Sequence, residues 1–469
     1  MATASAQRPQ LEYPQPAAVP NRKKVVRLTL WPLVAATFFM VSGGTYGTEE
    51  IVHGAGYWRG ILILLITPLL WSLPTAFMIG ELSSALPFEG GYYAWVRRAM
   101  GNFWGFQEAW LSLIASIFDM AIYPTLFVAY LIRMFPWFQE ANRGWWVALA
   151  VVVACALLNI AGVKVVSLTS LWLFFALSAP FIAIVLLSPF KLGALANAVT
   201  RPTTSNVDIL GGLLICMWNY MGWDNASTIA TEVERPQRTY PRAMLVAVTI
   251  VAITYVLPFA AMWMTGLKAT AWETGSWADI AALVGGPLLR VGIVLGGMIS
   301  AFGMFNALVM SYSRLPLAMA QDGMLPAVFA KLRKKSRAPW VAIIALAIGW
   351  AMCLGLGFAR LVTIDILLYG ASLSLEFLAL AVLRFREPDL KRPFRVPGGK
   401  LGAIAIGIPP VLLLVFSVIR SEHESILGMS SFAFGVILIA AGGLAYGLNH
   451  ALKPGGWSVA ESKKPQPAA

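Results

Sequence analysis

The stretch FFMVSGGTYGTEEIVHG, residues 38–54, decides how the rest of this sequence is interpreted. It begins as an apolar helix, continues into a glycine-rich break over 43–47, and then meets the carboxylates Glu49 and Glu50. Unpaired backbone groups and charges are costly in hydrocarbon, so a membrane helix is broken in this way only where it lines a watery cavity or binds something. We therefore interpret residues 38–54 as one half of a substrate site within a membrane.

The composition places the whole chain in a membrane. Of its 469 residues, 58% are hydrophobic and only 12% are charged, whereas soluble domains carry about 25% charged residues. The net charge of +13 does not require nucleic acid as a partner, because membrane proteins concentrate Lys and Arg in cytoplasmic loops. The cysteines and histidines are too scattered for a disulfide framework or a metal site, so we expect no metal and no cofactor: Cys155, Cys216, Cys353, His53, His423 and His450.

Apolar segments long enough to cross a bilayer recur along the chain. A crossing helix needs about 20 mostly apolar residues. The sequence predicts an all-α polytopic protein with twelve such segments: 30–53, 60–86, 102–133, 146–162, 164–188, 207–231, 243–266, 286–319, 339–358, 361–384, 401–420 and 430–450. Only a short polar joint near Gly162 and Lys164 divides the fourth from the fifth, so eleven remains open. The membrane domain extends over 28–452, and we expect the tails 1–27 and 453–469 to be disordered.

The distribution of Lys and Arg predicts the orientation. Cytoplasmic loops carry the excess of basic residues, and alternate loops of this chain hold such clusters. We therefore expect both termini to be cytoplasmic and the protein to lie in the cell (plasma) membrane. The basic residues on that side are Arg22, Lys23, Lys24, Arg27, Arg97, Arg98, Arg235, Arg238, Arg242, Lys331, Arg333, Lys334, Lys335, Arg337 and those of the run 384–400.

A second broken segment lies five spans after the first. The sixth span reads LLICMWNYMGWDNASTIATEVERP over 213–236, where an apolar run meets Asn219, Gly222 and Asp224. Interrupted helices at corresponding positions of two halves point to the binding site of an inverted-repeat transporter. Spans one to five (about 30–188) and six to ten (about 207–384) would then be the repeats, followed by two more helices over 401–450. The competing interpretation is two kinked helices with packing glycines.

Several motifs in order resemble one family over nearly the whole length. They are GGTYGTEE (43–50), PFEGGYYAWV (87–96), DMAIYPTLF (119–127), WNYMGWDNAST (218–228), MAQDGMLPAVFA (319–330) and LLYGASLSLEFLAL (367–380). The chain resembles the amino acid–polyamine–organocation (APC) superfamily, and within it the plant-type polyamine uptake and L-type amino acid transporter branch. The resemblance implies a LeuT-like fold of 5+5 inverted repeats, a substrate at the midplane between helices one and six, and proton-coupled uptake by alternating access.

The first break has groups that suit an amino acid or an amine. Backbone N–H groups at Gly43, Gly44 and Thr45 could receive a carboxylate, helped by the positive end of the following half-helix. Carbonyls near Ser42 could receive an ammonium group, and Glu49 could attract a cation or carry a proton. The alternative for Glu49 and Glu50 is a hydrated outer vestibule. The candidate residues here are Ser42, Gly43, Gly44, Thr45, Tyr46, Gly47 and Glu49.

The second break and two other spans add further candidates. Aromatic faces attract ammonium groups by cation–π interactions worth roughly 0.5–2 kcal/mol, although core packing would also explain them. Asp119 and Tyr123 are four residues apart, and Tyr369 and Glu376 seven, so each pair shares one helix face. The candidate residues are Trp218, Asn219, Tyr220, Trp223, Asp224, Asp119, Tyr123 and Tyr369 for substrate, and Glu49, Asp224 and Glu376 for proton coupling.

Two further residues concern gating and ions. Glu81, near Arg97 and Arg98 in the sequence, is expected to stabilise a cytoplasmic gate. Some superfamily members carry a coupling lysine inside the fifth span, but the only lysine of that segment here, Lys164, stands at its entrance. Acids are therefore the expected proton carriers, and a sodium ion near Ser300 remains open.

The acids in or near spans decide the expected substrate. Glu49, Asp119, Asp224 and Glu376 have almost no matching Lys or Arg within the spans, and a buried charge costs about 2.5–3.5 kcal/mol on insertion scales. A cation is the natural partner, so we expect a proton-coupled symporter of polyamines or cationic amino acids. A transporter or exchanger of neutral amino acids is the alternative. An enzyme or a channel is not favoured, and we expect lipid contacts and a monomer or weak dimer.

Overall fold

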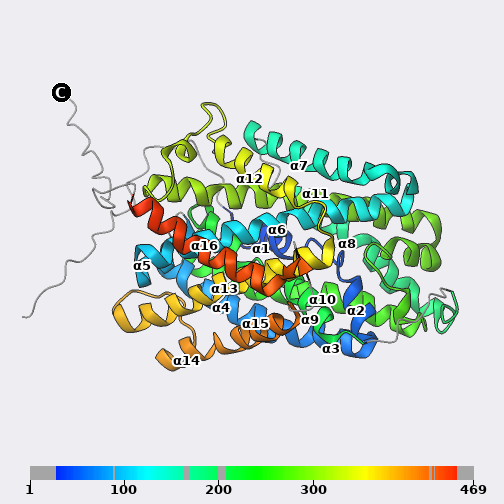
Figure 1. Ribbon diagram of the computed structural model, residues 1–469. Helices are drawn as coiled ribbons and strands as arrows, with labels where there is room; N and C mark the ends of the chain where they lie inside the picture. Colours follow the sequence, from blue (N-terminus) through cyan, green and yellow to red (C-terminus); the bar gives the residue numbers. More distant parts are fainter. Residues whose placement is uncertain are drawn as a thin grey trace, which may run out of the picture.

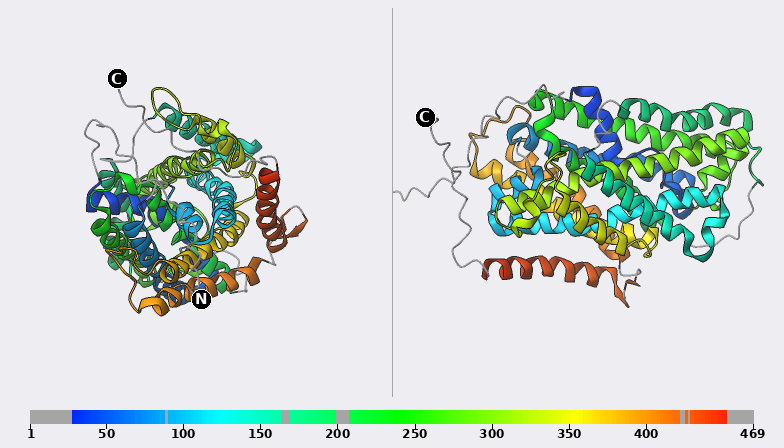
Figure 2. Two further views of the ribbon diagram at one scale, coloured as in Figure 1. Left: turned by 90° about the vertical axis from the view of Figure 1, so that its left-hand side faces the viewer. Right: turned by 90° about the horizontal axis from the view of Figure 1, so that it is seen from above.

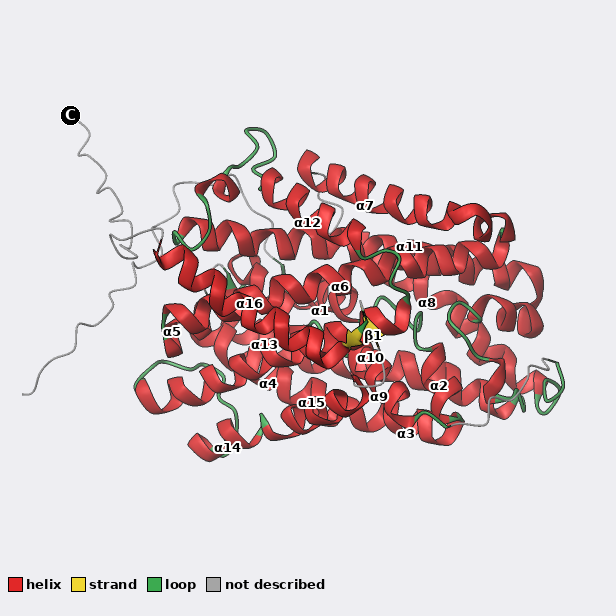
Figure 3. Cartoon of the chain, in the orientation of Figure 1, coloured by secondary structure: helices red, strands yellow, loops and turns green. Residues whose placement is uncertain are grey.

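The computed structural model describes residues 28–87, 90–162, 169–198, 207–421, 425–426 and 428–451 (Figure 1). The tails 1–27 and 453–469, and Lys164 in the joint of the fourth and fifth spans, lie outside the described residues. The described chain is a bundle of helices, and its strands are limited to one short hairpin (Figure 3). The helices run largely side by side, with α16 at the edge of the bundle (Figure 2).

The apolar segments expected to cross the membrane form helices. The helices are α1 (Leu30–Val41), α2 (Glu49–Ala55), α3 (Tyr57–Thr67), α4 (Leu73–Ala85), α5 (Gly91–Met100), α6 (Asn102–Met134), α7 (Arg143–Ala161), α8 (Thr169–Leu187), α9 (Ile209–Asn219), α10 (Pro236–Met264), α11 (Trp277–Gln321), α12 (Trp340–Met352), α13 (Phe358–Arg386), α14 (Gly399–Ala405), α15 (Ile408–Ser421) and α16 (Ser431–Ala451). A π-helical turn, Pro68–Ser72, joins α3 to α4. The strands β1 (Ser425–Ile426) and β2 (Met429–Ser430) pair antiparallel.

The apolar lengths identify a multi-pass membrane protein. Nine helical stretches of the described chain are long and apolar enough to span a bilayer. Two shorter apolar helices, α1 and α12, add to them. Large apolar side chains such as Leu157, Leu288 and Met352 are exposed on the outside of the bundle, where a soluble protein would place polar groups and a membrane protein meets lipid.

The first break occurs where the glycines predict it. Helix α1 ends at Val41, where the Ser42 N–H still donates to the Phe38 carbonyl (2.8 Å), and α2 begins at Glu49. Gly43 has φ +60°, a left-handed conformation that costs a side-chain-bearing residue roughly 1–2 kcal/mol. The chain therefore leaves the helix at this position and resumes it six residues later.

The second break is present too, and it lies against the first. Helix α9 ends at Asn219, Gly222 has φ +86°, and a 3-10 helix follows over Trp223–Glu232. A Cβ atom at Gly222 would come within 2.9 Å of the Met40 carbonyl oxygen at the end of α1. A glycine is thus needed here both for the backbone conformation and for the close approach of the two interrupted segments.

Several boundaries differ from the sequence-based expectation. Residues 91–100, expected in a loop, form α5, a short amphipathic helix too brief and too charged to be recognised as a span. Helix α11 begins at Trp277 rather than near 286, because an outer segment joins the span at a kink at Gly286. Helix α10 begins at Pro236 rather than near 243, and α12 ends at Met352 rather than near 358.

The bundle has two distinct ends. Helices α5 and α14 lie toward one end and α2 and α3 toward the other (Figure 1). We call these the α5 end and the α2 end. Helix α6 runs from the α5 end toward the α2 end, and α13, which packs along α6, runs in the opposite direction. Side chains on the facing sides of α6 and α13 therefore meet in reverse order.

Candidate substrate site at the two helix breaks

One hydrogen bond joins the two breaks directly, and another connects the first break to α11. The Asn219 side-chain amide donates to the Gly47 carbonyl (3.3 Å). The Ser300 hydroxyl on α11 donates to the Gly43 carbonyl (2.5 Å). The expected residues Gly43, Gly47 and Asn219 therefore lie together at one buried place, and carbonyl oxygens of the first break face neighbouring helices.

The backbone N–H groups of Gly43 and Gly44 in the first break are already engaged. The Gly43 N–H donates to the Phe38 carbonyl (3.2 Å), and the Gly44 N–H donates to the Ser42 hydroxyl (3.1 Å). The Thr45 hydroxyl donates to the Thr254 carbonyl on α10 (2.8 Å). A carboxylate could use these N–H groups only by replacing the present bonds, which makes the break a poorer carboxylate site in this conformation than its glycines indicate.

Asp119 is the centre of the aromatic part of the site. Its Oδ1 accepts hydrogen bonds from the Trp218 indole N–H and the Tyr123 hydroxyl, each at 3.2 Å. Its Oδ2 accepts from the Tyr312 hydroxyl on α11 (3.2 Å). The structure thus brings Trp218 of the second break together with Asp119 and Tyr123, whose four-residue spacing predicts that they share a helix face. Tyr312 was missed although Ser311 and Ser313 flank it in the eighth span, because the sequence does not show that it faces Asp119.

Asp224 joins the second break to α13. Its Oδ1 accepts from the Tyr369 hydroxyl (2.5 Å), and that hydroxyl accepts from the Gly222 N–H (3.2 Å). Tyr220 and Trp223, the other aromatic candidates of the second break, donate to backbone carbonyls and not to a buried acid. Tyr220 donates to the Leu64 carbonyl (3.0 Å) and Trp223 to the Tyr220 carbonyl (2.7 Å), which is how core residues of the bundle are satisfied. Tyr46 packs its ring edge-on against Tyr130 and Phe181.

Three further buried carboxyl groups lie along the same helices. Asp365 and Glu376 on α13 and Glu108 on α6 have no more than 1% of their surface exposed. Both carboxyl oxygens of Asp365 and of Glu376, and one of Glu108, have no hydrogen-bond partner in the described part of the chain. Asp365 was missed in the sequence, although a single acid inside an apolar span is itself a signal of function.

These acids form two groups along the facing sides of α6 and α13. Glu108 and Asp119 are eleven residues apart on α6, and so are Asp365 and Glu376 on α13. At 1.5 Å per residue that is about 16 Å in each helix. Asp365 interacts electrostatically with Asp119, and Glu376 with Glu108. We call Asp119 and Asp365 the outer acid pair and Glu108 and Glu376 the inner acid pair.

Asp224 lies between the two pairs, and serines connect the helices beside it. Asp224 interacts electrostatically with Asp365 of the outer pair and with Glu376 of the inner pair. The Ser372 hydroxyl on α13 lies 2.9 Å from that of Ser112 on α6 and donates to Glu108 (2.6 Å). None of the five acids forms an ion pair with Lys or Arg within the described residues. Their negative charge is therefore uncompensated by the protein.

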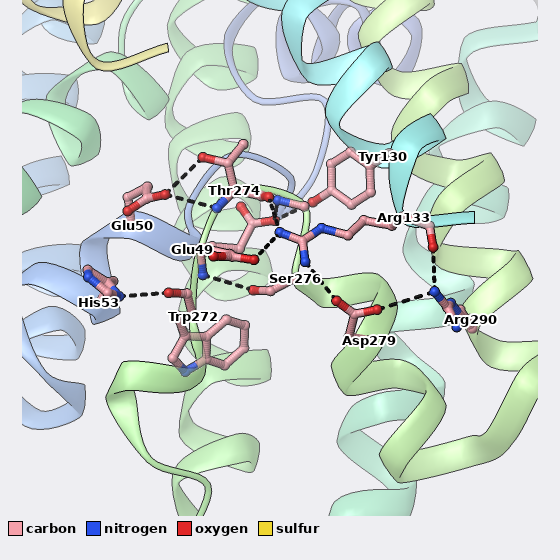
Figure 4. A network of polar contacts seen from close by, with 12 residues as sticks. Glu49, Glu50, His53, Tyr130, Arg133, Trp272, Thr274, Ser276, Asp279 and Arg290 are labelled. Atoms are coloured by element: carbon pink, nitrogen blue, oxygen red, sulfur yellow. Dashed lines mark hydrogen bonds and ion pairs between the residues drawn. The ribbon is translucent and has the colours of Figure 1, made fainter. Parts of the chain in front are cut away.

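Glu49 lies at the α2 end and holds the loop between α10 and α11 (Figure 4). Its carboxylate accepts from the Tyr130 hydroxyl (2.5 Å) and the Gly275 N–H (3.0 Å). Glu50 accepts from the N–H and the hydroxyl of Thr274, both at 2.9 Å. Glu50 is therefore not simply hydrated. In this conformation, both acids bind the loop that joins α10 to α11, and one oxygen of the buried Glu49 has no partner in the described chain.

Basic residues complete the contacts at the α2 end. Arg133 at the end of α6 forms ion pairs with Glu273 (2.5 Å) and Asp279 (2.9 Å). Arg290 reaches the other oxygen of Asp279 (3.4 Å) and donates to the Arg133 carbonyl. Figure 4 shows these side chains around the same loop that Glu49 and Glu50 bind.

Glu81 is part of a buried ion cluster at the α5 end, but with partners other than those expected. It forms a bidentate pair with Arg384 (2.5 Å) and a second ion pair with Arg392 (3.1 Å). Arg97 pairs with Asp322 (2.5 Å) and Arg98 with Glu387 (2.7 Å). Glu81 therefore does not pair with Arg97 or Arg98, which are near it in the sequence, but with arginines about 300 positions further along the chain.

Comparison with known proteins shows the family of the chain. The profile of the amino acid permease family matches residues 34–441. Polyamine transporter RMV1 of Arabidopsis thaliana is 34% identical over 90% of this chain and 87% of its own length. Polyamine transporter PUT1 of Oryza sativa subsp. japonica is 33% identical over 88% and 77%, and the serine/threonine exchanger SteT of Bacillus subtilis is 26% identical over 68% and 74%. The chain therefore belongs to the amino acid permease family, in the plant polyamine transporter branch of the APC superfamily, and is a membrane transporter and not an enzyme.

Proposed function

We propose that this transporter takes up polyamines or cationic amino acids together with protons. The observation that carries the proposal is the set of five buried acids around the two breaks, none of which pairs with Lys or Arg among the described residues. Each would be expensive as an isolated charge in the membrane, so a substrate ammonium group is their natural partner. Relatives named polyamine transporters support the same class of substrate.

We propose a twelve-span, LeuT-like architecture of two inverted repeats for this activity. The breaks after α1 and α9 would occupy matching positions of the repeats, and alternating access would expose their junction first to one side and then to the other. Both termini would lie in the cytoplasm, at the α5 end, and the protein would lie in the plasma membrane. The ion cluster of Glu81 would close the cytoplasmic side, and the loop bound by Glu49 and Glu50 would close the outer side.

Different acids would bind the substrate and carry the proton. The outer acid pair and Asp224 would receive ammonium groups, with Trp218 and Tyr123 beside them to supply aromatic faces. The inner acid pair would hold a proton, because two buried carboxyl groups in electrostatic contact cannot both ionise without a cation. Glu49 and Asp224 are the other candidate proton carriers. Backbone carbonyls of the first break, over 42–47, would complete the substrate site.

Purified protein should bind amines in preference to neutral amino acids. We expect putrescine and spermidine, or arginine, to raise the melting temperature in a concentration-dependent way, since a ligand that binds only the folded state stabilises it. Replacing Asp365 with Asn should weaken amine binding by roughly 30-fold or more, as expected when one partner of a buried charge pair is removed. A thermal-shift titration with putrescine, spermidine, arginine, leucine and alanine measures both effects.

The control for this experiment is Asp389→Asn, the same change at an exposed position. It should bind amines as the unaltered protein does. Stabilisation by leucine or alanine, without any by amines, would instead favour a neutral amino acid transporter or exchanger, the activity named for the Bacillus subtilis relative. Amine binding that is equal in Asp365→Asn and Asp389→Asn would remove Asp365 from the site.

Uptake should be driven by protons. In proteoliposomes with an inward pH gradient, we expect the labelled amine to accumulate and the accumulation to disappear when a protonophore is added, because the buried acids must be reprotonated in each cycle. Replacing sodium with potassium at constant pH gradient should leave the rate unchanged. Accumulation that follows a sodium gradient and ignores the protonophore would contradict the proton coupling.

A further inference from the structure

A cavity with a positive lining lies away from the acids, between the starts of α1 and α10. Its volume is about 310 Å³. It lies at the α5 end, because the 3-10 helix Trp223–Glu232 that leads into it packs on α5. The lining residues are Thr29, Leu30, Glu234, Arg235, Arg238, Thr239 and Arg242.

The charges of this cavity suit an anion. Arg238 and Arg242 are four residues apart on one face of α10, and Arg235 directly precedes the helix. Against these three guanidinium groups the lining has one carboxylate, Glu234, which lies 3.9 Å from Arg235 and is partly exposed. Arg238 and Arg242 are exposed and form no ion pair with the described residues. The cavity therefore keeps a net positive charge and two guanidinium groups available to a ligand.

The backbone adds donors to the same place. Helix α1 begins in the cavity wall, and its N-cap residue Thr29 makes no side-chain hydrogen bond to the first turn. The N–H groups at a helix start have no partner within the helix and carry partial positive charge. Phosphate groups bind at such positions, particularly where arginine can form paired hydrogen bonds with their oxygens.

The surroundings favour a lipid as the source of the phosphate. Trp31, beside Leu30 on α1, is 59% exposed, and Leu245, one turn beyond Arg242 on α10, is 37% exposed. Exposed Trp and Leu next to a group of arginines are typical of the membrane interface, with apolar side chains toward the acyl chains and basic ones toward the headgroups. A phospholipid can occupy both environments at once, whereas free phosphate occupies only the polar one.

We infer that this cavity binds the headgroup phosphate of an anionic phospholipid. The ligand would join two segments that one backbone contact already holds together. The Glu234 N–H donates to the Leu28 carbonyl (2.9 Å), which ties the chain before α1 to the chain before α10. Because α1 leads directly into the first break, a bound lipid would stabilise the position of α1 against α10 that this contact holds. The lipid composition would thus affect how readily the α5 end opens.

The test compares two double variants in purified protein without substrate, so that its result does not depend on the transported molecule. The first is Arg238→Gln with Arg242→Gln, which alters two exposed arginines of the cavity. The matched control is Lys334→Gln with Lys335→Gln, which removes the same charge from exposed positions outside the lining. Each is titrated with phosphatidylglycerol and with phosphatidylcholine in nanodiscs or detergent, and thermal stabilisation is followed.

We expect phosphatidylglycerol, but not phosphatidylcholine, to stabilise the unaltered protein and the lysine control. The arginine variant should need about 30-fold more of the anionic lipid for the same rise in melting temperature. Each basic residue near anionic lipid contributes about 1 kcal/mol, and the variant loses two of them. Equal stabilisation of all three proteins by phosphatidylglycerol would overturn the inference. Stabilisation by inorganic phosphate equal to that by the lipid would show a soluble-anion site and overturn it as well. If the double variant is unstable, Arg242→Gln alone provides the same comparison.

Discussion

Replacing Gly43 with Ala is expected to reduce uptake to background while the protein still reaches the membrane. The residue has φ +60°, and an added Cβ would collide with the Met304 side chain and the Ser300 hydroxyl. The collision would separate the first break from α11 and remove the hydrogen bond from Ser300 to the Gly43 carbonyl. Uptake normalised to the amount of protein in the membrane measures the effect.

Gly193→Ala is the matched control for this change. Gly193 has φ +65°, almost the same backbone conformation, but nothing lies within 4 Å of an added Cβ. Both variants therefore carry a similar backbone strain, and only Gly43→Ala adds the collision at the break. Transport by Gly43→Ala at the level of Gly193→Ala would show that the close packing of the break against α11 is not needed for function.

The second large effect is expected for stability, at Glu81. Its carboxylate is fully buried between Arg384, which is 5% exposed, and Arg392, which is 2% exposed. Glu81→Ala would leave two buried guanidinium groups without their common acid, and breaking a buried ion pair in this way costs about 3–5 kcal/mol. It would also leave the Val396 N–H, which donates to Glu81 at 2.7 Å, without an acceptor.

Unfolding of purified protein, followed by heat or by denaturant, measures this loss. Glu140→Ala provides the comparison, because the Glu140 side chain is 72% exposed and pairs with Arg143 at the surface. An exposed pair contributes about 0–1 kcal/mol, so Glu140→Ala should unfold close to the unaltered protein. Equal stability of the two variants would mean that the buried cluster contributes no more than a surface pair.

The sequence was sufficient for features that depend on local conformation. Glycine is the residue that leaves a helix with positive φ at little cost, so the breaks at Gly43 and Gly222 could be located without a structure. Residues on one helix face could be paired as well, since Asp119 and Tyr123 are four apart and indeed form a hydrogen bond.

The partners of Glu81 and Glu49 could not be predicted, because they lie in segments far away in the sequence. Glu81 was assigned to the nearest arginines in the sequence, but its partners Arg384 and Arg392 come from the far end of α13 and the loop that follows. Glu49 was placed with the neighbouring glycines, whereas its carboxylate contacts Tyr130 and Gly275. Local spacing cannot predict such partners, because a side chain at the end of a short helix can turn toward several neighbouring elements.

Asp365 was not recognised from the sequence for a different reason. It lies in the mostly apolar run LVTIDILL (361–368), outside the two glycine breaks that drew attention to the site. Its importance follows from its position opposite Asp119, which only the antiparallel packing of α6 and α13 reveals. The same packing places Glu108, which is not among the candidate residues from the sequence, beside Glu376.

The loop between α10 and α11 is held in a way that has an evolutionary consequence. Glu49 binds the backbone N–H of Gly275, and Glu50 binds the backbone N–H of Thr274 in addition to its hydroxyl. A backbone donor is present whatever side chain occupies the position, proline excepted. A changed side chain at Thr274 would therefore keep its backbone contact to Glu50, while Gly275 is fixed by its φ of +83°. Selection would act on the path of the loop backbone, so relatives could diverge in this segment while keeping the same closure.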